Sequence, residues 1–319
     1  FQELSILVDI IRENWGGEYY ITACSNHPTA EERVAELDID LDKLVQGDDI
    51  AYNPSITGVR EQVNMISRVY DTIRKACTAA MEPSDVSHVM HLHADAWPLS
   101  EEKLYELIDE MEARDQPVAF KGYGLGRRGV FPIGHVMDQY FVLEVEYAED
   151  VNFFEHSVLE LLPDRGIHTV MMLILLGKVG WSNVYFYSDG SEQVYWDGEE
   201  SFGVNPMMYN PDWEYVHIKR DDFPDDIGKT LQAVYLAEHG VTNGPHIEPL
   251  IEGHGMLREE LVSRLNRLEE TYDDKLSWYG LSVADDFNRN FGIADRFLSH
   301  SRPGRLKAAA GKHALTVSQ

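Results

Sequence analysis

The architecture of this chain can be worked out from one segment, Ser87-His88-Val89-Met90-His91-Leu92-His93-Ala94-Asp95-Ala96-Trp97-Pro98. Residues 87–92 are mostly apolar and predict a buried strand. His93 and Asp95 follow where this strand ends. A helix is expected next, because Ser100 can cap it and apolar side chains recur behind it at helical spacing, namely Leu104, Leu107, Ile108 and Met111.

The same alternation of helix and strand extends outward on both sides. Leu4, Leu7, Val8 and Ile11 predict a helix. Strands are expected at 19–24 and 118–121, and a helix at 59–80. This order predicts an α/β fold with parallel strands, and we expect one further strand to precede Phe1. Polar clusters follow three of the strands, at Ser25-Asn26, His93–Asp95 and Gly122–Arg128, so a ligand site is expected at the carboxyl edge of the sheet.

Charge and cysteine content limit the possible functions. The 319 residues carry 27 Lys and Arg against 55 Asp and Glu, a formal charge of -28. Such a chain repels polyphosphate backbones, so we expect no nucleic-acid partner. Two cysteines make no disulfide framework, and no signal peptide or membrane span is visible, which predicts a reducing, cytoplasmic location.

The C-terminal part differs in composition from the rest. From Met256 onward, Leu257, Leu261, Leu265 and Leu268 recur at helical spacing among Arg and Glu. This pattern predicts a helical extension over 251–300, suited to packing or to a homo-oligomer. After Ser301 the chain is basic without acidic residues, so we expect a mobile tail over 301–319. Its four cations leave open a peripheral contact with an anionic membrane.

His93 and Asp95 are the first candidates for chemistry. Side chains two apart on a strand point the same way, so both can approach one cation. A carboxylate with an imidazole favours Mn²⁺ or Mg²⁺. The simpler interpretation makes His91 a core histidine and Asp95 a turn cap.

The order of motifs resembles a known family. The first strand ends in Ser25-Asn26. The next helix is preceded by Asn53-Pro54 and begins around Gly58-Val59-Arg60-Glu61-Gln62-Val63-Asn64. A later strand ends in His93-Ala94-Asp95. This arrangement is similar to nucleotide-diphospho-sugar glycosyltransferases of the GT-A fold, nearest the family 2 type. The resemblance covers about residues 1–250 and implies one catalytic domain there. Its fold would be Rossmann-like, with a mixed, mostly parallel sheet flanked by helices.

The resemblance also implies an activity and a set of site residues. A sugar would pass from a nucleotide-diphosphate donor to a hydroxyl acceptor, which could be a glycan, a lipid carrier or a protein. The family's Asp-x-Asp motif, which holds a divalent cation, reads His93-x-Asp95 here. His246, with His254 as second choice, would be the late metal ligand. The nucleotide-sugar side would be served by Thr22, Ser25, Asn26, Asn53, Arg60 and Asn64. Arg127 and Arg128, in the glycine-rich loop 122–129, could supply the positive charge that the leaving diphosphate needs, or belong to a flexible surface hairpin.

A proton acceptor is also needed for an inverting transfer. Asp138 in Gly134-His135-Val136-Met137-Asp138 is our candidate, and Glu155 with His156 is the second. The simpler interpretation makes Asp138 a turn former. Trp97 could stack on a sugar or belong to the core.

Two other functions compete with the transferase. His91-x-His93-x-Asp95 resembles the opening of the metallo-β-lactamase motif, which would make the protein a metal-dependent hydrolase. Ala96 stands where that motif has its last His, so a ligand is missing. The second competitor is a non-catalytic, GT-A-like binding protein, because His93 replaces the first carboxylate.

Overall fold

A computed structural model describes residues 1–48, 59–128, 131–155, 175–188, 207–210, 213–218, 226–264 and 312–318, together with Arg220 and Arg267. Within these ranges, side chains are not described for a few stretches, chiefly 59–67, 122–128, 131–135, 207–210 and 312–318.

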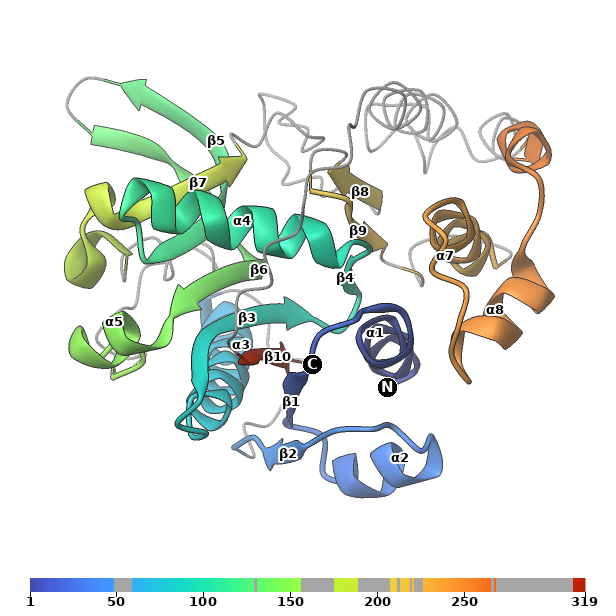
Figure 1. Cartoon of the computed structure of the whole chain (residues 1–319), viewed down its shortest axis with the longest axis horizontal. Helices are drawn as coiled ribbons and strands as arrows, with labels where there is room; N and C mark the ends of the chain where they lie inside the picture. Colours follow the sequence, from blue (N-terminus) through green and yellow to red (C-terminus); the bar gives the residue numbers. More distant parts are fainter. Residues whose placement is uncertain are drawn as a thin grey trace.

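The main sheet has seven strands, and six of them run in the same direction. β6 alone is antiparallel to both of its neighbours. The predicted mixed, mostly parallel sheet is therefore confirmed (Figure 1). In spatial order the strands are β2 (Lys43–Gln46), β1 (Tyr19–Ser25), β10 (Lys312–Ser318), β3 (Val86–His93), β6 (Phe131–Glu144), β5 (Val118–Arg128) and β7 (Val184–Ser188).

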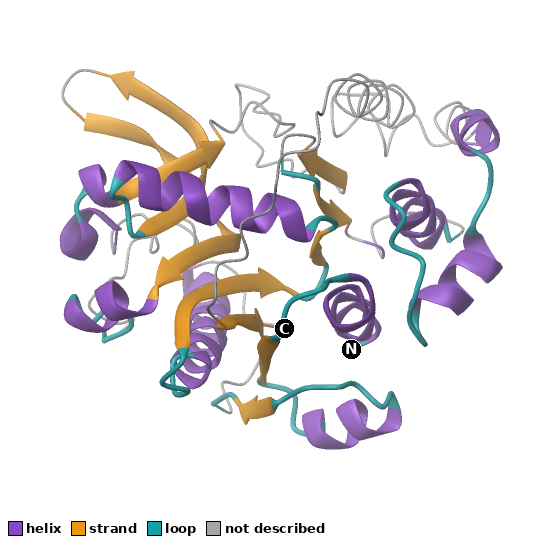
Figure 2. Cartoon of the chain, viewed as in Figure 1, coloured by secondary structure: helices purple, strands orange, loops and turns teal. Residues whose placement is uncertain are grey.

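Helices cover both faces of this sheet, as Figures 1 and 2 show. One core packs β-strand side chains against α1 (Gln2–Asn14), α4 (Glu101–Arg114) and α7 (Ile227–Glu238). The other packs them against α3 (Val59–Ala80) and α5 (Val145–Asp150). β3 serves both cores, because Met90 belongs to the first and Val89 to the second. This alternation explains why the segment is apolar at nearly every position.

α4 forms as its sequence predicts. The Ser100 hydroxyl accepts a hydrogen bond from the Lys103 amide at 3.4 Å and caps the first turn. All four apolar residues of the predicted stripe are buried. Asp115 ends the helix in the left-handed conformation, with φ of 55°.

A second, antiparallel sheet lies beside the carboxyl edge of the first. It contains β4 (Ala96–Pro98), β9 (Tyr215–Ile218) and β8 (Met207–Asn210), in that order. Trp97 on β4 is fully buried, and its indole donates to the Ala94 carbonyl at 2.8 Å. Of the two interpretations of Trp97, the structure shows the core residue.

The position of β10 corrects the expectation for the tail. Instead of forming a mobile end, Lys312–Ser318 pair in parallel with β1 on one side and β3 on the other. No strand precedes α1 among the described residues, and β10 lies where such a strand would join β1 to β3. The basic charge of 301–319 predicts a mobile end, but the run Ala314-Leu315-Thr316-Val317-Ser318 is rich in strand-forming residues.

Shorter elements complete the part of the chain that is described. They are α2 (Ala30–Glu36), α8 (Ile247–His254), a π-helical turn at Leu175–Val179 and a 3₁₀ turn at Trp181–Asn183. Residues 258–264 are helical, with Leu261 buried and Leu257 exposed. Leu265 and Leu268 lie outside the described residues, so the helical extension and its boundaries stay predictions. No described helix has the length and apolar character needed to cross a bilayer.

Candidate active site

Polar side chains gather at the carboxyl edge of the main sheet. In the parallel register, Cys24 of β1 lies level with Ser318 of β10, which lies level with His93 of β3. β5 reaches the same edge at Lys121, and antiparallel β6 carries the buried Asp138 there. Side chains from distant parts of the chain are thus brought to one edge of the sheet.

Two imidazole–carboxylate pairs lie at the centre of this edge. His93 Nε2 lies 3.4 Å from Asp138 Oδ2, and His217 Nε2 lies 3.1 Å from Asp95 Oδ2. The Asp138 and His217 side chains are only 2% and 3% exposed, whereas those of His93 and Asp95 are 23% and 33% exposed. Each pair therefore has one buried member and one that reaches solvent. We call these four residues, together with Lys121, the imidazole–carboxylate cluster.

The pair of Asp95 and His217 shows which protonation state the local electrostatics favour. Burial alone would raise the pKa of Asp95, but His217 and His93 outweigh it and lower that pKa to about 2. Asp95 is thus a carboxylate at any neutral pH. Its partner His217 belongs to β9, whose backbone pairs with Ala96 of β4, so the pair ties the end of β3 to the second sheet.

An aromatic wall backs the cluster. Tyr215 lies 5.1 Å from Tyr140, and Tyr187 lies 5.4 Å from Tyr140, as ring centroids. The ammonium of Lys121, itself 2% exposed, lies 5.8 Å from the Tyr215 ring. Burial raises the pKa of Tyr215, and the charges of Asp95 and Asp138 raise it further. The charges of Asp95 and Asp138 therefore act on the Tyr215 side of this wall, and the aromatic rings exclude water from around the two carboxylates.

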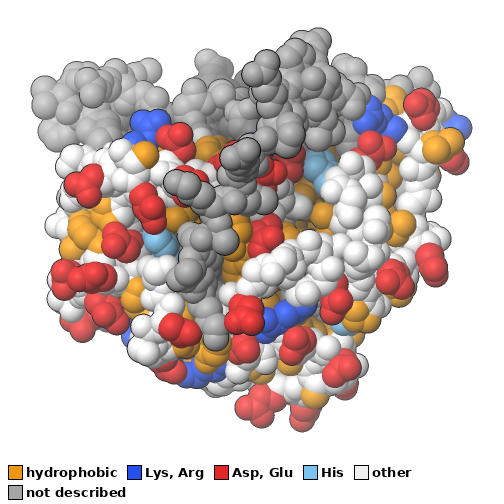
Figure 3. Space-filling view, viewed as in Figure 1, with side chains coloured by type: hydrophobic (Ala, Val, Ile, Leu, Met, Phe, Trp, Pro, Cys, Tyr) orange, Lys and Arg blue, Asp and Glu red, His pale blue; other side chains and the backbone are white. Residues whose placement is uncertain are grey.

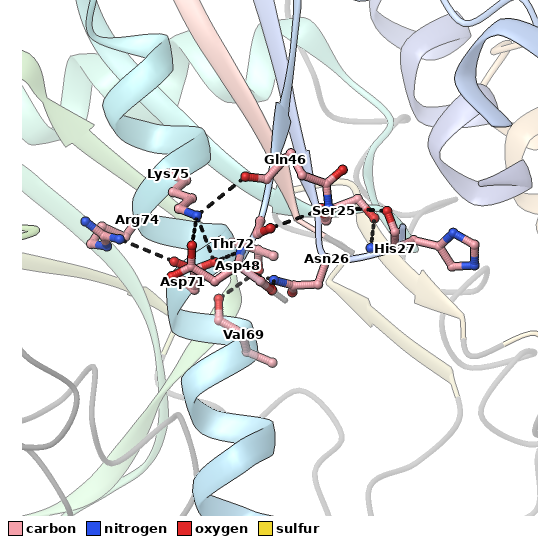
Figure 4. Close-up of polar contacts among 11 residues, drawn as sticks. Ser25, Asn26, His27, Gln46, Asp48, Val69, Asp71, Thr72, Arg74 and Lys75 are labelled. Carbon is pink, nitrogen blue, oxygen red and sulfur yellow. Dashed lines mark hydrogen bonds and ion pairs between the residues drawn. The ribbon is translucent and has the colours of Figure 1, made fainter. Parts of the chain in front are cut away.

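A second polar region lies at the same edge, where β1 and β2 meet α3 (Figure 4). The Asp71 carboxylate accepts the Asp48 amide at 2.7 Å and the Asn26 side-chain amide at 3.4 Å. Lys75 lies 2.5 Å from Asp48 and 3.4 Å from Asp71. We call Asn26, Asp48, Asp71 and Lys75, with Arg74 beside them, the α3 network. It fixes the chain just before residues 49–58.

The residues predicted for the nucleotide fall into three groups. Thr22 points into the fold, where its hydroxyl donates to the Ala76 carbonyl at 3.0 Å. Ser25 accepts from the His27 amide at 3.1 Å and, with Asn26, lies at the sheet edge. Asn53 lies outside the described residues, and only the backbone is described for Arg60 and Asn64 on α3 and for Arg127 and Arg128 on β5.

The predicted metal ligands are not brought together. His246 lies at the start of α8, where Nδ1 is 3.1 Å from an Asp9 oxygen and Nε2 is 2.8 Å from the Leu37 carbonyl. Both of its ring nitrogens thus tie α8 to α1 and α2. Among the described residues, no three His, Cys, Asp or Glu side chains form a group that could hold a metal ion. The donor set implied by the resemblance does not fit this structure.

The remaining candidate residues are His91, Glu155, His254 and His156. His91 is fully buried, 4.7 Å from the Phe141 ring, and burial lowers its pKa well below the usual value. This is the core histidine of the simpler interpretation, and it weakens the hydrolase motif. Glu155 is exposed after α5, His254 ends α8, and His156 lies outside the described residues.

Sequence reasoning missed Lys121, His217 and Tyr215. Lys121 could have been found, because it ends the predicted strand 118–121 and is charged where the other strands carry polar residues. His217 and Tyr215 lie about 120 residues beyond Asp95 in the chain, and no local signal connects them to it.

A cleft of about 490 Å³ lies at the opposite, amino edge of the sheet. His88 and Pro117 line it, together with the carboxylates of Glu112, Asp115 and Glu144. Burial raises the pKa of Glu144, and the neighbouring Glu146, Glu112 and Asp115 raise it further. Three acidic groups repel a diphosphate, so this cleft does not suit the donor that the resemblance implies.

Comparisons with known proteins add little. No protein-family model matches the chain, and no curated protein matches it. Among solved structures, the apo form of mouse xyloside xylosyltransferase 1 is similar over 58% of this chain and 78% of its own length. The TM-score is 0.34 and the sequence identity is 11%. A likeness of this size assigns neither the fold nor the activity.

Proposed function

We propose that the protein transfers a sugar from a nucleotide-diphosphate donor to a hydroxyl acceptor. The observation that carries the proposal is the pair of His93 and Asp138 at the carboxyl edge, with a buried carboxylate behind a partly exposed imidazole. Such a pair is suited to accept a proton from a hydroxyl group. The resemblance, which rests on the order of motifs in residues 1–250, supplies the donor class.

The α3 network marks the nucleotide side of the site. The resemblance places the nucleobase and ribose beside Ser25 and Asn26, and both lie at the carboxyl edge. The Asn26 side-chain amide donates to the Asp48 carbonyl at 2.9 Å, which holds these two loops together. The donor's diphosphate would then extend from β1 across β10 toward His93 and Lys121.

The reaction can be written from these positions. The acceptor hydroxyl oxygen attacks the anomeric carbon of the sugar while its proton passes to the His93–Asp138 pair. The bond between that carbon and the phosphate oxygen breaks, and its electrons stay on the departing diphosphate. Asp138 keeps its role as the predicted base, acting through His93 because Asp138 itself is almost fully buried. A direct attack of this kind inverts the configuration of the sugar.

The acidic surface bears on the choice of ligand. Asp and Glu side chains are spread over the face seen in Figure 3, with few Lys and Arg between them. An anionic donor therefore needs local cations, and the described ones at this edge include Lys121 in the cluster and Lys75 and Arg74 in the α3 network. Self-association through the helix after Met256 also stays part of the proposal, and light scattering of the full chain tests it.

A thermal-shift panel tests the donor. The full chain is melted with UDP, GDP, CDP and dTDP and with their sugars, because a ligand of the native state raises Tm. One base should raise Tm, and its sugar conjugate should lose the sugar to water or to an offered acceptor. No shift with any nucleotide would overturn the transferase. Binding without turnover under every acceptor class would instead favour the non-catalytic binding protein.

A further inference from the structure

We propose that the site handles its diphosphate donor without a divalent cation, using Lys121 in place of the metal. The inference rests on the proposed function and departs from what the resemblance implies for cofactors.

The first reason is that the side chain at the position of the missing carboxylate is engaged. His93 replaces the first acidic residue of the Asp-x-Asp motif, and its Nε2 faces Asp138 at 3.4 Å. A cation bound by His93 through this nitrogen would have to displace it from the carboxylate. The Asp138 side chain, at 2% exposure, has no room to follow a ligand outward without disturbing the core.

The second reason is that the remaining carboxylate is engaged as well. Asp95 Oδ2 lies 3.1 Å from His217 Nε2. His217 cannot easily turn away, because its backbone pairs with Ala96 on one side and with Met208 on the other. The pair is therefore part of the second sheet's framework, and Asp95 would have to lose this partner to ligate a metal.

The third reason is the local charge. Asp95 and Asp138 share this edge with the Lys121 ammonium. The ammonium repels a divalent cation and offsets part of the attraction of the two carboxylates, and these effects are strong in a desolvated site. A diphosphate meets the opposite situation, because the same ammonium attracts the charge that grows on the leaving group. The Lys121 side chain is 2% exposed, so its ammonium would act on the diphosphate through its charge and not by direct contact, in the role that the metal has in the family.

Metal binding is tested on the full chain without any nucleotide. Mn²⁺ is titrated in by calorimetry and by the loss of its free-ion paramagnetic resonance signal. We expect no stoichiometric binding by the wild-type protein. His93→Asp recreates Asp-x-Asp beside Asp138 and should gain Mn²⁺ binding. His27→Asp, which adds a carboxylate at an exposed position of the same edge, should not. Stoichiometric wild-type binding that Asp95→Asn removes would overturn the proposal, whether or not His93→Asp folds.

Donor binding gives the second test. The nucleotide that raises Tm should do so equally in EDTA and in Mn²⁺, and Lys121→Met should weaken its binding at least tenfold without lowering Tm. A shift that requires Mn²⁺, or a Lys121→Met variant with unchanged affinity, would overturn the metal-free site. The absence of any nucleotide shift would count against the proposed function instead, while the metal titration would still be decided on its own.

Discussion

The imidazole–carboxylate cluster and the α3 network lie at the same edge of one sheet and are built differently. In the α3 network, a single carboxylate, Asp71, accepts a backbone amide and a side-chain amide and faces two cations. In the cluster, each carboxylate has one described imidazole partner within 4 Å, and the surroundings are aromatic. The charge of Asp71 is thus shared among several contacts, whereas Asp95 and Asp138 each face an imidazole in aromatic surroundings.

This difference indicates two roles. A saturated network of hydrogen bonds holds loops in place and stabilises the fold. In the desolvated, aromatic surroundings of the cluster, a carboxylate or imidazole acts strongly on a ligand. Substitutions in the network should therefore change mainly stability, whereas those in the cluster should change activity, and Asp95 should also contribute to stability through its contact with His217.

The largest effect is expected for Asp138→Asn. The amide cannot stabilise the positive charge that His93 gains when it accepts the proton, so sugar transfer should fall about 10²- to 10⁴-fold. Nucleotide affinity should stay within about threefold, because Asp138 lies behind His93. Initial rates and thermal shifts measure the two quantities. Asp109→Asn, on the exposed face of α4, is the matched control and should leave both unchanged. An active Asp138→Asn enzyme would assign the cluster to structure.

Asp95→Asn should cost stability in a pH-dependent way. The folded-state pKa of about 2 lies below the unfolded value of 3.8, so the carboxylate stabilises the fold above pH 4 and this contribution is lost as pH falls toward 2. The shift corresponds to about 2 kcal/mol after allowance for the one-third exposure of the side chain. Urea unfolding of both proteins at pH 7, 5, 4 and 3 checks this. A difference independent of pH would show that His217 does not stabilise the charge.

Asp71→Asn should break the α3 network. The new amide group cannot accept the Asp48 and Asn26 donors equally well and no longer attracts Arg74 and Lys75. We expect a loss of about 1.5 kcal/mol in the free energy of unfolding. Weaker nucleotide binding should follow, with the turnover of bound donor unchanged. If kcat falls while stability does not, the division of roles between the two regions is wrong.

Thr22→Val should have the smallest effect of the four substitutions. It removes one buried hydrogen bond to the Ala76 carbonyl and should cost about 1 kcal/mol. Nucleotide affinity should not change, because the hydroxyl faces α3 and not the sheet edge. A clear loss of affinity at unchanged Tm would restore Thr22 to the nucleotide site that the resemblance gave it.

Much of the fold could be predicted from local patterns. The stripe of α4 and the apolar run of β3 each carry enough information over a dozen residues to identify the element. The convergence of strand ends followed from parallel order alone. The order of the strands in space did not, because β10 pairs with β1, about 290 residues earlier in the chain, and with β3, about 220 residues earlier.

The candidate site was harder to predict, for a physical reason. His93, Asp95 and Asp138 stand next to recognisable strands, and their spacing made them candidates. What decides their chemistry is the partner of each, and His217 comes from β9 in a different sheet. The predicted metal site does not form at His246 for the same reason. Its ring nitrogens are taken up by Asp9 and Leu37, contacts that no sequence spacing reveals.

The central place of β10 bears on how the protein is made. During translation, β1 and β3 leave the ribosome with a strand-wide gap between them, and β10 follows roughly 220 residues after β3. At 5–20 residues per second, this is a delay of about 11–45 s. Through that interval both strands offer unpaired edges, which invite pairing with other chains. A nascent chain of this protein is therefore expected to depend on chaperones until Ser318 has emerged, and slowed translation should increase its aggregation.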